Sequence, residues 1–160
     1  MPNKFRHVPN LEFPELSSKT LENGRFYTTP NGDVYPSVTT ILGYASDKTW
    51  LDDWKNRVGE EEVKRVSGQA ARRGTAVHEI TEKYLRNENH ISRQMPVNIA
   101  SFNNIKPLLD KNIGLIAGLE IPLYSDFLKV AGRVDCIAKW QNVWSIIDFK
   151  TSKREKKTKD

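Results

Sequence analysis

The order of patterns along the chain predicts an α+β (mixed α/β) fold, in which helices come first and a largely antiparallel sheet follows. Apolar residues recur with helical spacing within residues 37–112. Between residues 115 and 152 the period changes, and three strand-like runs follow one another across short polar links. With 160 residues, the chain is long enough for one domain with a core. We therefore expect a single domain over residues 24–160.

The N-terminal part combines a segment without pattern and a hairpin. Three prolines interrupt residues 1–23, which are therefore expected to be irregular. Residues 26–29 and 34–35 form strand-like runs around an Asn-Gly turn, which is typical of a hairpin. Ser37 then suits the N-cap of a short helix that ends near Gly43.

Three further segments have helical patterns: "SDKTWLDDWKNRVGEEEVKRVS", "GQAARRGTAVHEITEKYLRN" and "NIASFNNIKPLLDKNI". The last is the weakest, because Pro107 interrupts or restarts it. Trp50 and Trp54 lie on one face of the first, at positions i and i+4. They form either a packing face or a surface on which nucleic-acid bases stack.

Composition and charge favour an anionic partner only weakly. The net charge is +5, with a pI near 9.3. One cysteine excludes a disulfide framework and predicts a reducing, intracellular compartment. Cys136 itself lies within an apolar strand run and suits a small core residue. No run approaches the roughly 20 apolar residues of a membrane helix, so no membrane partner is expected.

The last two strand-like runs bring carboxylates together if they pair as a hairpin around "QN". Ile146 would then lie opposite Ile137, and Asp148 opposite Asp135, provided that no bulge intervenes. Lys150 would project from the same face as Asp148, since alternate strand residues share a face. One face of the hairpin would pack, and the other would gather charged groups.

Glu120 adds a third carboxylate, because it alternates with Leu119 and Ile121 and so points away from them. Each acid alone is explained by a surface charge at a strand end. Three acids that interrupt three apolar strands are explained better by a hard divalent cation with oxygen ligands.

Taken in order, these motifs resemble the PD-(D/E)XK nuclease superfamily. They are most similar to its RecB-like branch, with the phage exonucleases and the mitochondrial genome maintenance exonucleases. The matching segments are "YPSVTTIL", "RRGTAVHEITEKYL", "GLEIPLYSDFLKVAGRVDCIA" and "WSIIDFKTSK", within residues 25–153. The resemblance implies a restriction-endonuclease-like core, here a three-stranded, mostly antiparallel sheet flanked by N-terminal helices.

The resemblance also implies roles for individual residues. Asp135 and Asp148 match the two aspartates that bind Mg²⁺ or Mn²⁺, and Glu120 matches the upstream acid of the site. His78 matches a helix histidine that adds a metal ligand. Lys150 matches the lysine that positions or polarises the attacking water, a step in which a bound cation would lower the pKa of that water.

Three further residues match positions that contact nucleic acid. Thr151 and Ser152 correspond to a polar pair beside the DNA backbone, and Arg73 is a candidate phosphate contact. The function implied is a metal-dependent DNA exonuclease acting on single strands or DNA ends. The alternative is a noncatalytic nucleic-acid-binding or assembly module, or an inactive fragment, that keeps the nuclease scaffold.

In the family, a helix carrying Gln and Tyr, and then usually a strand, follow the D-x-K strand, and this sequence has neither. The chain is thus expected to be a fragment, a split product completed by a second polypeptide, or a shortened variant. If it is phage-encoded, its compartment is the host cytoplasm.

Overall fold

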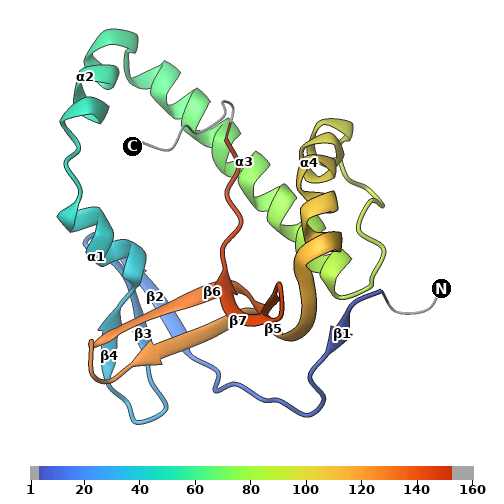
Figure 1. Ribbon diagram of the computed structural model, residues 1–160. Helices are drawn as coiled ribbons and strands as arrows, with labels where there is room; N and C mark the ends of the chain where they lie inside the picture. Colours follow the sequence, from blue (N-terminus) through green and yellow to red (C-terminus); the bar gives the residue numbers. More distant parts are fainter. Residues whose placement is uncertain (1–3, 153–160) are drawn as a thin grey trace.

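A computed structural model of the chain describes residues 4–152 and has mixed α+β architecture with two sheets (Figure 1). The larger sheet has the order β1-β5-β6-β7, where β1 is parallel to β5 and the other pairs are antiparallel. Its strands are β1 (Arg6–His7), β5 (Ile113–Ser125), β6 (Val130–Trp140) and β7 (Val143–Ile147). The smaller, antiparallel sheet consists of β2 (Ser17–Leu21), β3 (Gly24–Thr28) and β4 (Val34–Pro36).

The strand count and the N-terminal segment differ from expectation. The larger sheet has four strands rather than three, because β1 adds to the edge of β5. Residues 1–23 were expected to be irregular, yet they supply β1 and β2. Both strands are short and exposed, so their sequences lack the apolar alternation that predicts a strand. Strand β1 pairs with the distant β5, and β2 pairs with β3, which follows it. The hairpin of β3 and β4 is confirmed.

Four helices connect the sheets: α1 (Val38–Ala45), α2 (Thr49–Val58), α3 (Glu60–Leu85) and α4 (Pro96–Asn112). Ser37 caps α1 as expected, since its side chain accepts a hydrogen bond from the backbone N–H of Thr40. Three glutamates in the first turn of α3 suit the positive end of the helix dipole. Helix α4 begins with Pro96 and runs through Pro107. Within residues 4–152, no helix is both long and apolar enough to cross a membrane.

One helix boundary was predicted wrongly. The pattern around Trp50 suggested one helix up to residue 67, but the helix is interrupted at Gly59, whose φ is 84°. This left-handed backbone is accessible to glycine at little cost, and it separates α2 from α3. Helix α2 buries no residue, and Trp50 is 67% exposed, so its Trp pair is not part of a buried core.

The main core lies between the larger sheet and the helices α3 and α4. Fully buried Ile80 and Leu85 of α3 and Phe102 of α4 pack against Ile116 and Cys136 of the sheet. Burial raises the pKa of the Cys136 thiol to about 12, which keeps it a neutral core side chain as expected. A smaller cluster joins the second sheet to the far end of the β5–β6 hairpin.

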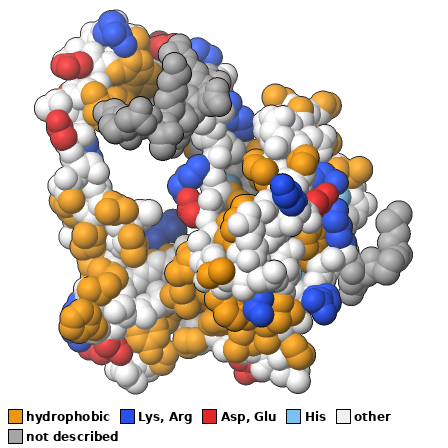
Figure 2. Space-filling model, in the orientation of Figure 1, with side chains coloured by type: hydrophobic (Ala, Val, Ile, Leu, Met, Phe, Trp, Pro, Cys, Tyr) orange, Lys and Arg blue, Asp and Glu red, His pale blue; other side chains and the backbone are white. Residues whose placement is uncertain are grey.

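Figure 2 shows an opening beside this core. Helices α1 and α2 form one side of it, and α3 forms the other (Figures 1 and 2). Lys and Arg side chains, coloured blue, are visible around the opening. The segment after β7 runs along this opening, beside α3 (Figure 1).

Candidate metal centre

Three potential metal ligands meet where α3 crosses the β5–β6 hairpin. His78 of α3, Glu120 of β5 and Asp135 of β6 each offer a donor atom, and these atoms all lie within 4.8 Å of one another. We call these three residues the triad. Each is partly buried, so the carboxylates are shielded from water without being sealed from it.

The hairpin places the two carboxylates opposite each other. Leu119 pairs with Cys136 and Ile121 with Val134, which leaves Glu120 facing Asp135. Glu120 has a φ of 54°, an uncommon backbone for a residue other than glycine. The guanidinium of Arg133 donates a 2.7 Å hydrogen bond to the Glu120 carbonyl at this distortion. The irregular backbone thus lies at a site residue, where such outliers are frequent.

Electrostatics at the hairpin favour a cation. Burial, followed by the nearby carboxylates of Asp135 and Glu82, raises the pKa of Glu120 above its ordinary value, while His78 and Arg133 oppose the rise. Like charges are therefore held together at some cost in this hollow. A divalent cation between the carboxylates would relieve that repulsion.

The segment after β7 orients His78 and Asp135 through one residue. The backbone carbonyl of Phe149 accepts a hydrogen bond of 2.5 Å from Nε2 of His78. The backbone N–H of Phe149 donates to Oδ2 of Asp135 at 2.6 Å. With Nε2 protonated, the neutral imidazole presents the lone pair of Nδ1, which lies 3.6 Å from Asp135 Oδ2. Main-chain atoms of Phe149 thereby fix the tautomer of His78 and the orientations of the His78 and Asp135 side chains.

The donor set fits a divalent metal ion. One imidazole nitrogen and two carboxylate oxygens leave coordination positions for water or substrate. Mg²⁺ and Mn²⁺ both accept carboxylate oxygen, and the imidazole favours a transition metal over Mg²⁺. The geometry thus supports a metal site without identifying the metal.

Asp148 and Lys150 lie outside the triad. Strand β7 has the expected register, with Ile146 opposite Ile137, but its ladder ends at Ile147. Asp148 therefore does not form a cross-strand pair with Asp135, whose Oδ2 instead accepts the N–H of Phe149. The Asp148 carboxylate accepts a 2.7 Å hydrogen bond from the Lys150 ammonium. Both side chains are largely exposed, at 56% and 68%.

The predicted nucleic-acid contacts lie beside this segment. Arg73 of α3 lines a cavity together with Thr151 and Ser152. A Cβ atom on Gly74 would lie 3.7 Å from the Thr151 hydroxyl, so a small residue at this position lets the segment approach α3 closely. The structure thus brings these three residues to one side of the Asp148–Lys150 pair.

Two residues beside the triad were not among the predicted site residues. The role of Phe149 runs through its backbone atoms and leaves no trace in residue type; its position between Asp148 and Lys150 was the available signal. Glu82 lines the triad's hollow, and its carboxylate pairs with Arg86 at 2.9 Å. It is therefore a neighbour of the triad as well as a paired helix charge.

Comparisons with known proteins point to one group of relatives, although no family model matches the chain. The chain is 27% identical over 133 residues to mitochondrial genome maintenance exonuclease 1 of Homo sapiens, an alignment covering 78% of this chain and 38% of that protein. It is 28% identical over 134 residues to the Xenopus tropicalis protein of the same name, covering 79% of this chain and 38% of the relative. The chain therefore spans well under half the length of these relatives, which belong to the group of exonucleases that its motifs resemble.

Proposed function

We propose that this chain carries the metal site of a DNA exonuclease that hydrolyses phosphodiester bonds with Mg²⁺ or Mn²⁺. The observation that carries the proposal is the convergence of His78, Glu120 and Asp135 within 4.8 Å. The relatives named exonucleases support the reaction class. We also propose that the chain has a restriction-endonuclease-like core, belongs to the PD-(D/E)XK superfamily and acts inside the cell.

The proposed chemistry assigns each residue a task. The triad holds the cation, which when bound polarises the phosphoryl oxygens and acidifies a water molecule. Phe149 keeps the imidazole and the Asp135 carboxylate in orientation. Lys150, released from Asp148, supplies a compact positive charge for the attacking water or the phosphate. Asp148, the second aspartate of the motif, joins the metal site when the segment after β7 adjusts to substrate.

DNA is the proposed partner, held through its backbone. Arg73, Thr151 and Ser152 lie together beside the Asp148–Lys150 pair and offer donors to phosphate oxygens. The opening between α1–α2 and α3 gives a strand room to approach from the helical side (Figure 2). These features suit single strands or DNA ends, because they contact the backbone and do not place a protein helix or ribbon in the groove of a duplex.

Digestion of labelled single-stranded DNA with and without Mn²⁺ tests the proposal. We expect metal-dependent loss of the substrate, abolished by Asp135→Asn and strongly reduced by Lys150→Ala. Glu61→Gln is the matched control, because Glu61 is an exposed acid in the first turn of α3, away from the triad. Equal digestion by the Asp135→Asn variant would contradict the proposed site.

One observation favours the alternative of a noncatalytic nucleic-acid-binding or assembly module. Asp148 lies outside the triad and pairs with Lys150, so the ligand set is incomplete as it stands. This alternative predicts DNA binding that persists in EDTA without turnover.

A second polypeptide that completes the ligand set is another alternative; exposed Trp144 and Ile146 on the edge strand β7 support such a partner. Activity that appears only on adding a longer homologous chain would identify that case.

A further inference from the structure

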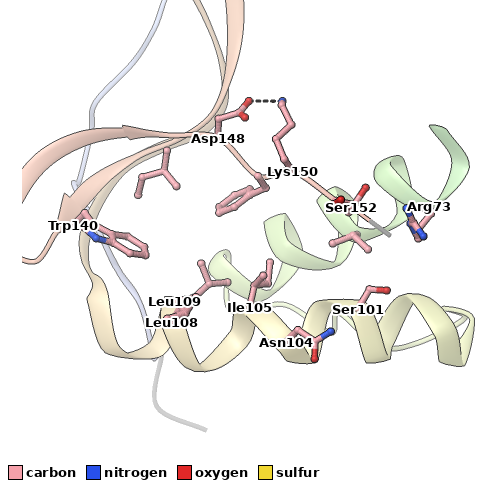
Figure 3. A pocket seen from close by; sticks show the side chains of 14 residues that line it. Arg73, Ser101, Asn104, Ile105, Leu108, Leu109, Trp140, Asp148, Lys150 and Ser152 are labelled. Atoms are coloured by element: carbon pink, nitrogen blue, oxygen red, sulfur yellow. Dashed lines mark hydrogen bonds and ion pairs between the residues drawn. The ribbon is translucent and has the colours of Figure 1, made fainter. Parts of the chain in front are cut away.

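A cavity separate from the triad lies between α3, α4 and the segment after β7 (Figure 3). Its volume is about 400 Å³, within the range of small-molecule sites. It shares no lining residue with the hollow around the triad. The two concavities adjoin, because Phe149 bonds the triad through its backbone and also lines this cavity.

The cavity has one apolar and one polar end. Trp140, Leu108 and Leu109 gather at the first, Arg73 and Ser101 lie at the second, and Asn104 lies between the two ends (Figure 3). The indole of Trp140 offers a flat aromatic surface at the apolar end. Such a division suits a ligand with a flat apolar part and a charged part.

Charge at the polar end favours an anion. Arg73 is partly buried and makes no hydrogen bond or ion pair with another residue of the described range 4–152. A partly desolvated guanidinium without a partner is well suited to bind a phosphate with two parallel hydrogen bonds. The acid nearest this end along the lining, Asp148, is already paired with Lys150.

We propose that this cavity binds one nucleotide of the DNA strand, with its base at the Trp140 end and its phosphate at Arg73. The inference rests on the proposed nuclease function and deepens it by adding a base-binding subsite next to the metal centre. A nucleobase combines a flat π-face with a polar edge, which Asn104 can meet with both a donor and an acceptor. Stacking on an aromatic side chain is tolerant of sequence, so the subsite would hold any strand without selecting it.

Titration of the chain with thymidine 5′-monophosphate, followed by tryptophan fluorescence, tests the subsite directly. We expect saturable binding, at least tenfold weaker for deoxyribose 5-phosphate, because that ligand keeps the phosphate and lacks the base. Equal affinity for the two ligands would overturn the proposal. Tighter binding of hexyl phosphate than of the nucleotide would overturn it too, since a flexible alkyl anion would then be the better occupant.

A pair of variants locates the binding. Asn104→Trp fills the cavity from α4, and Asn103→Trp places the same side chain on its exposed neighbour, which does not line the cavity. We expect the first to weaken binding of an oligothymidylate at least tenfold and the second to leave it unchanged. Circular dichroism checks that both variants fold. If either does not, the comparison of ligands on the unaltered chain still decides.

The outcomes separate this inference from the proposed function. Nucleotide binding without DNA hydrolysis would retain the subsite and reject the nuclease. Metal-dependent hydrolysis with no preference for thymidine 5′-monophosphate would retain the nuclease and reject the subsite.

Discussion

Replacing Phe149 by proline removes one main-chain N–H beside the triad and leaves every candidate ligand in the sequence. Proline has no N–H to donate to Asp135 Oδ2, a contact of 2.6 Å in the structure. The Asp135 side chain is only 13% exposed, so water replaces that donor poorly. Phe149→Leu is the matched control, because leucine keeps the N–H, the carbonyl and most of the apolar volume that packs against the core.

The size of the effect follows from the bond that is lost. A hydrogen bond to a charged group contributes about 1.5–3 kcal/mol, and each 1.4 kcal/mol corresponds to about tenfold in an equilibrium constant. The carbonyl of Phe149 also orients His78, so any shift of this residue loosens a second ligand. We therefore expect Mn²⁺ affinity to fall by about 10- to 100-fold, the usual range for residues that orient metal ligands.

Electron paramagnetic resonance of free Mn²⁺ during titration measures this affinity without requiring catalysis. Thermal unfolding followed by circular dichroism establishes that both variants are folded at the temperature used. The reasoning fails if Phe149→Pro binds Mn²⁺ as tightly as the unaltered chain. It fails equally if Phe149→Leu, with both backbone groups in place, loses as much affinity as the proline variant.

Three further predictions concern the triad, the ion-paired Asp110 and a turn. Glu120→Gln should abolish measurable Mn²⁺ binding while raising thermal stability, because it removes carboxylate repulsion from a partly buried hollow; titration and melting curves check the two effects. Although burial acts in the opposite direction, hydrogen bonds from Lys4, Tyr84 and Lys106 hold the pKa of Asp110 below its ordinary value. The Asp110 carboxylate thus contributes its full stabilisation above the pKa of the unfolded state, near 4, and this stabilisation is lost as the pH falls through the lower pKa of the folded state. We expect Asp110→Asn to lower the free energy of unfolding in urea by about 1 kcal/mol at pH 7 and by progressively less below pH 4. Gly24→Ala should destabilise the chain by about 1–3 kcal/mol, because Gly24 has a φ of 130° and a Cβ there would lie 2.4 Å from Thr40; a melting temperature equal to that of Gly43→Ala, an unhindered control, would contradict this.

Local patterns predicted the elements whose causes are local. The register of β6 and β7 followed from a short turn and alternating apolar residues, and Ile146 lies opposite Ile137 as expected. The Ser37 cap followed from its position before an apolar helix. Alternation with Leu119 and Ile121 predicted the face on which Glu120 lies; that Asp135 is its neighbour comes from the β5–β6 hairpin of the structure.

Long-range strand pairing could not be predicted from the sequence. Strand β1 has two residues, and it forms because it pairs in parallel with β5, which lies more than a hundred residues later in the chain. Lys4, next to it, bonds both Asp110 and Tyr84 and so joins the N-terminal segment to α3 and α4. Nothing in the local sequence distinguishes these residues from a solvated terminus, since their partners are supplied by tertiary structure.

Asp148 shows why strand spacing alone could not settle the ligand set. Counting places it opposite Asp135 only if the ladder continues past Ile147, but there the two potential hydrogen-bonding groups of Phe149 serve Asp135 and His78 instead. A strand partner would compete with the side chains of His78 and Asp135 for the same backbone atoms. The arrangement of His78 and Asp135 therefore comes at the expense of the regular strand, and Asp148 is left with Lys150. If Asp148 is a ligand during catalysis, its approach must keep both bonds of Phe149, which limits the adjustment to rotation of the Asp148 side chain and a small shift of its own backbone.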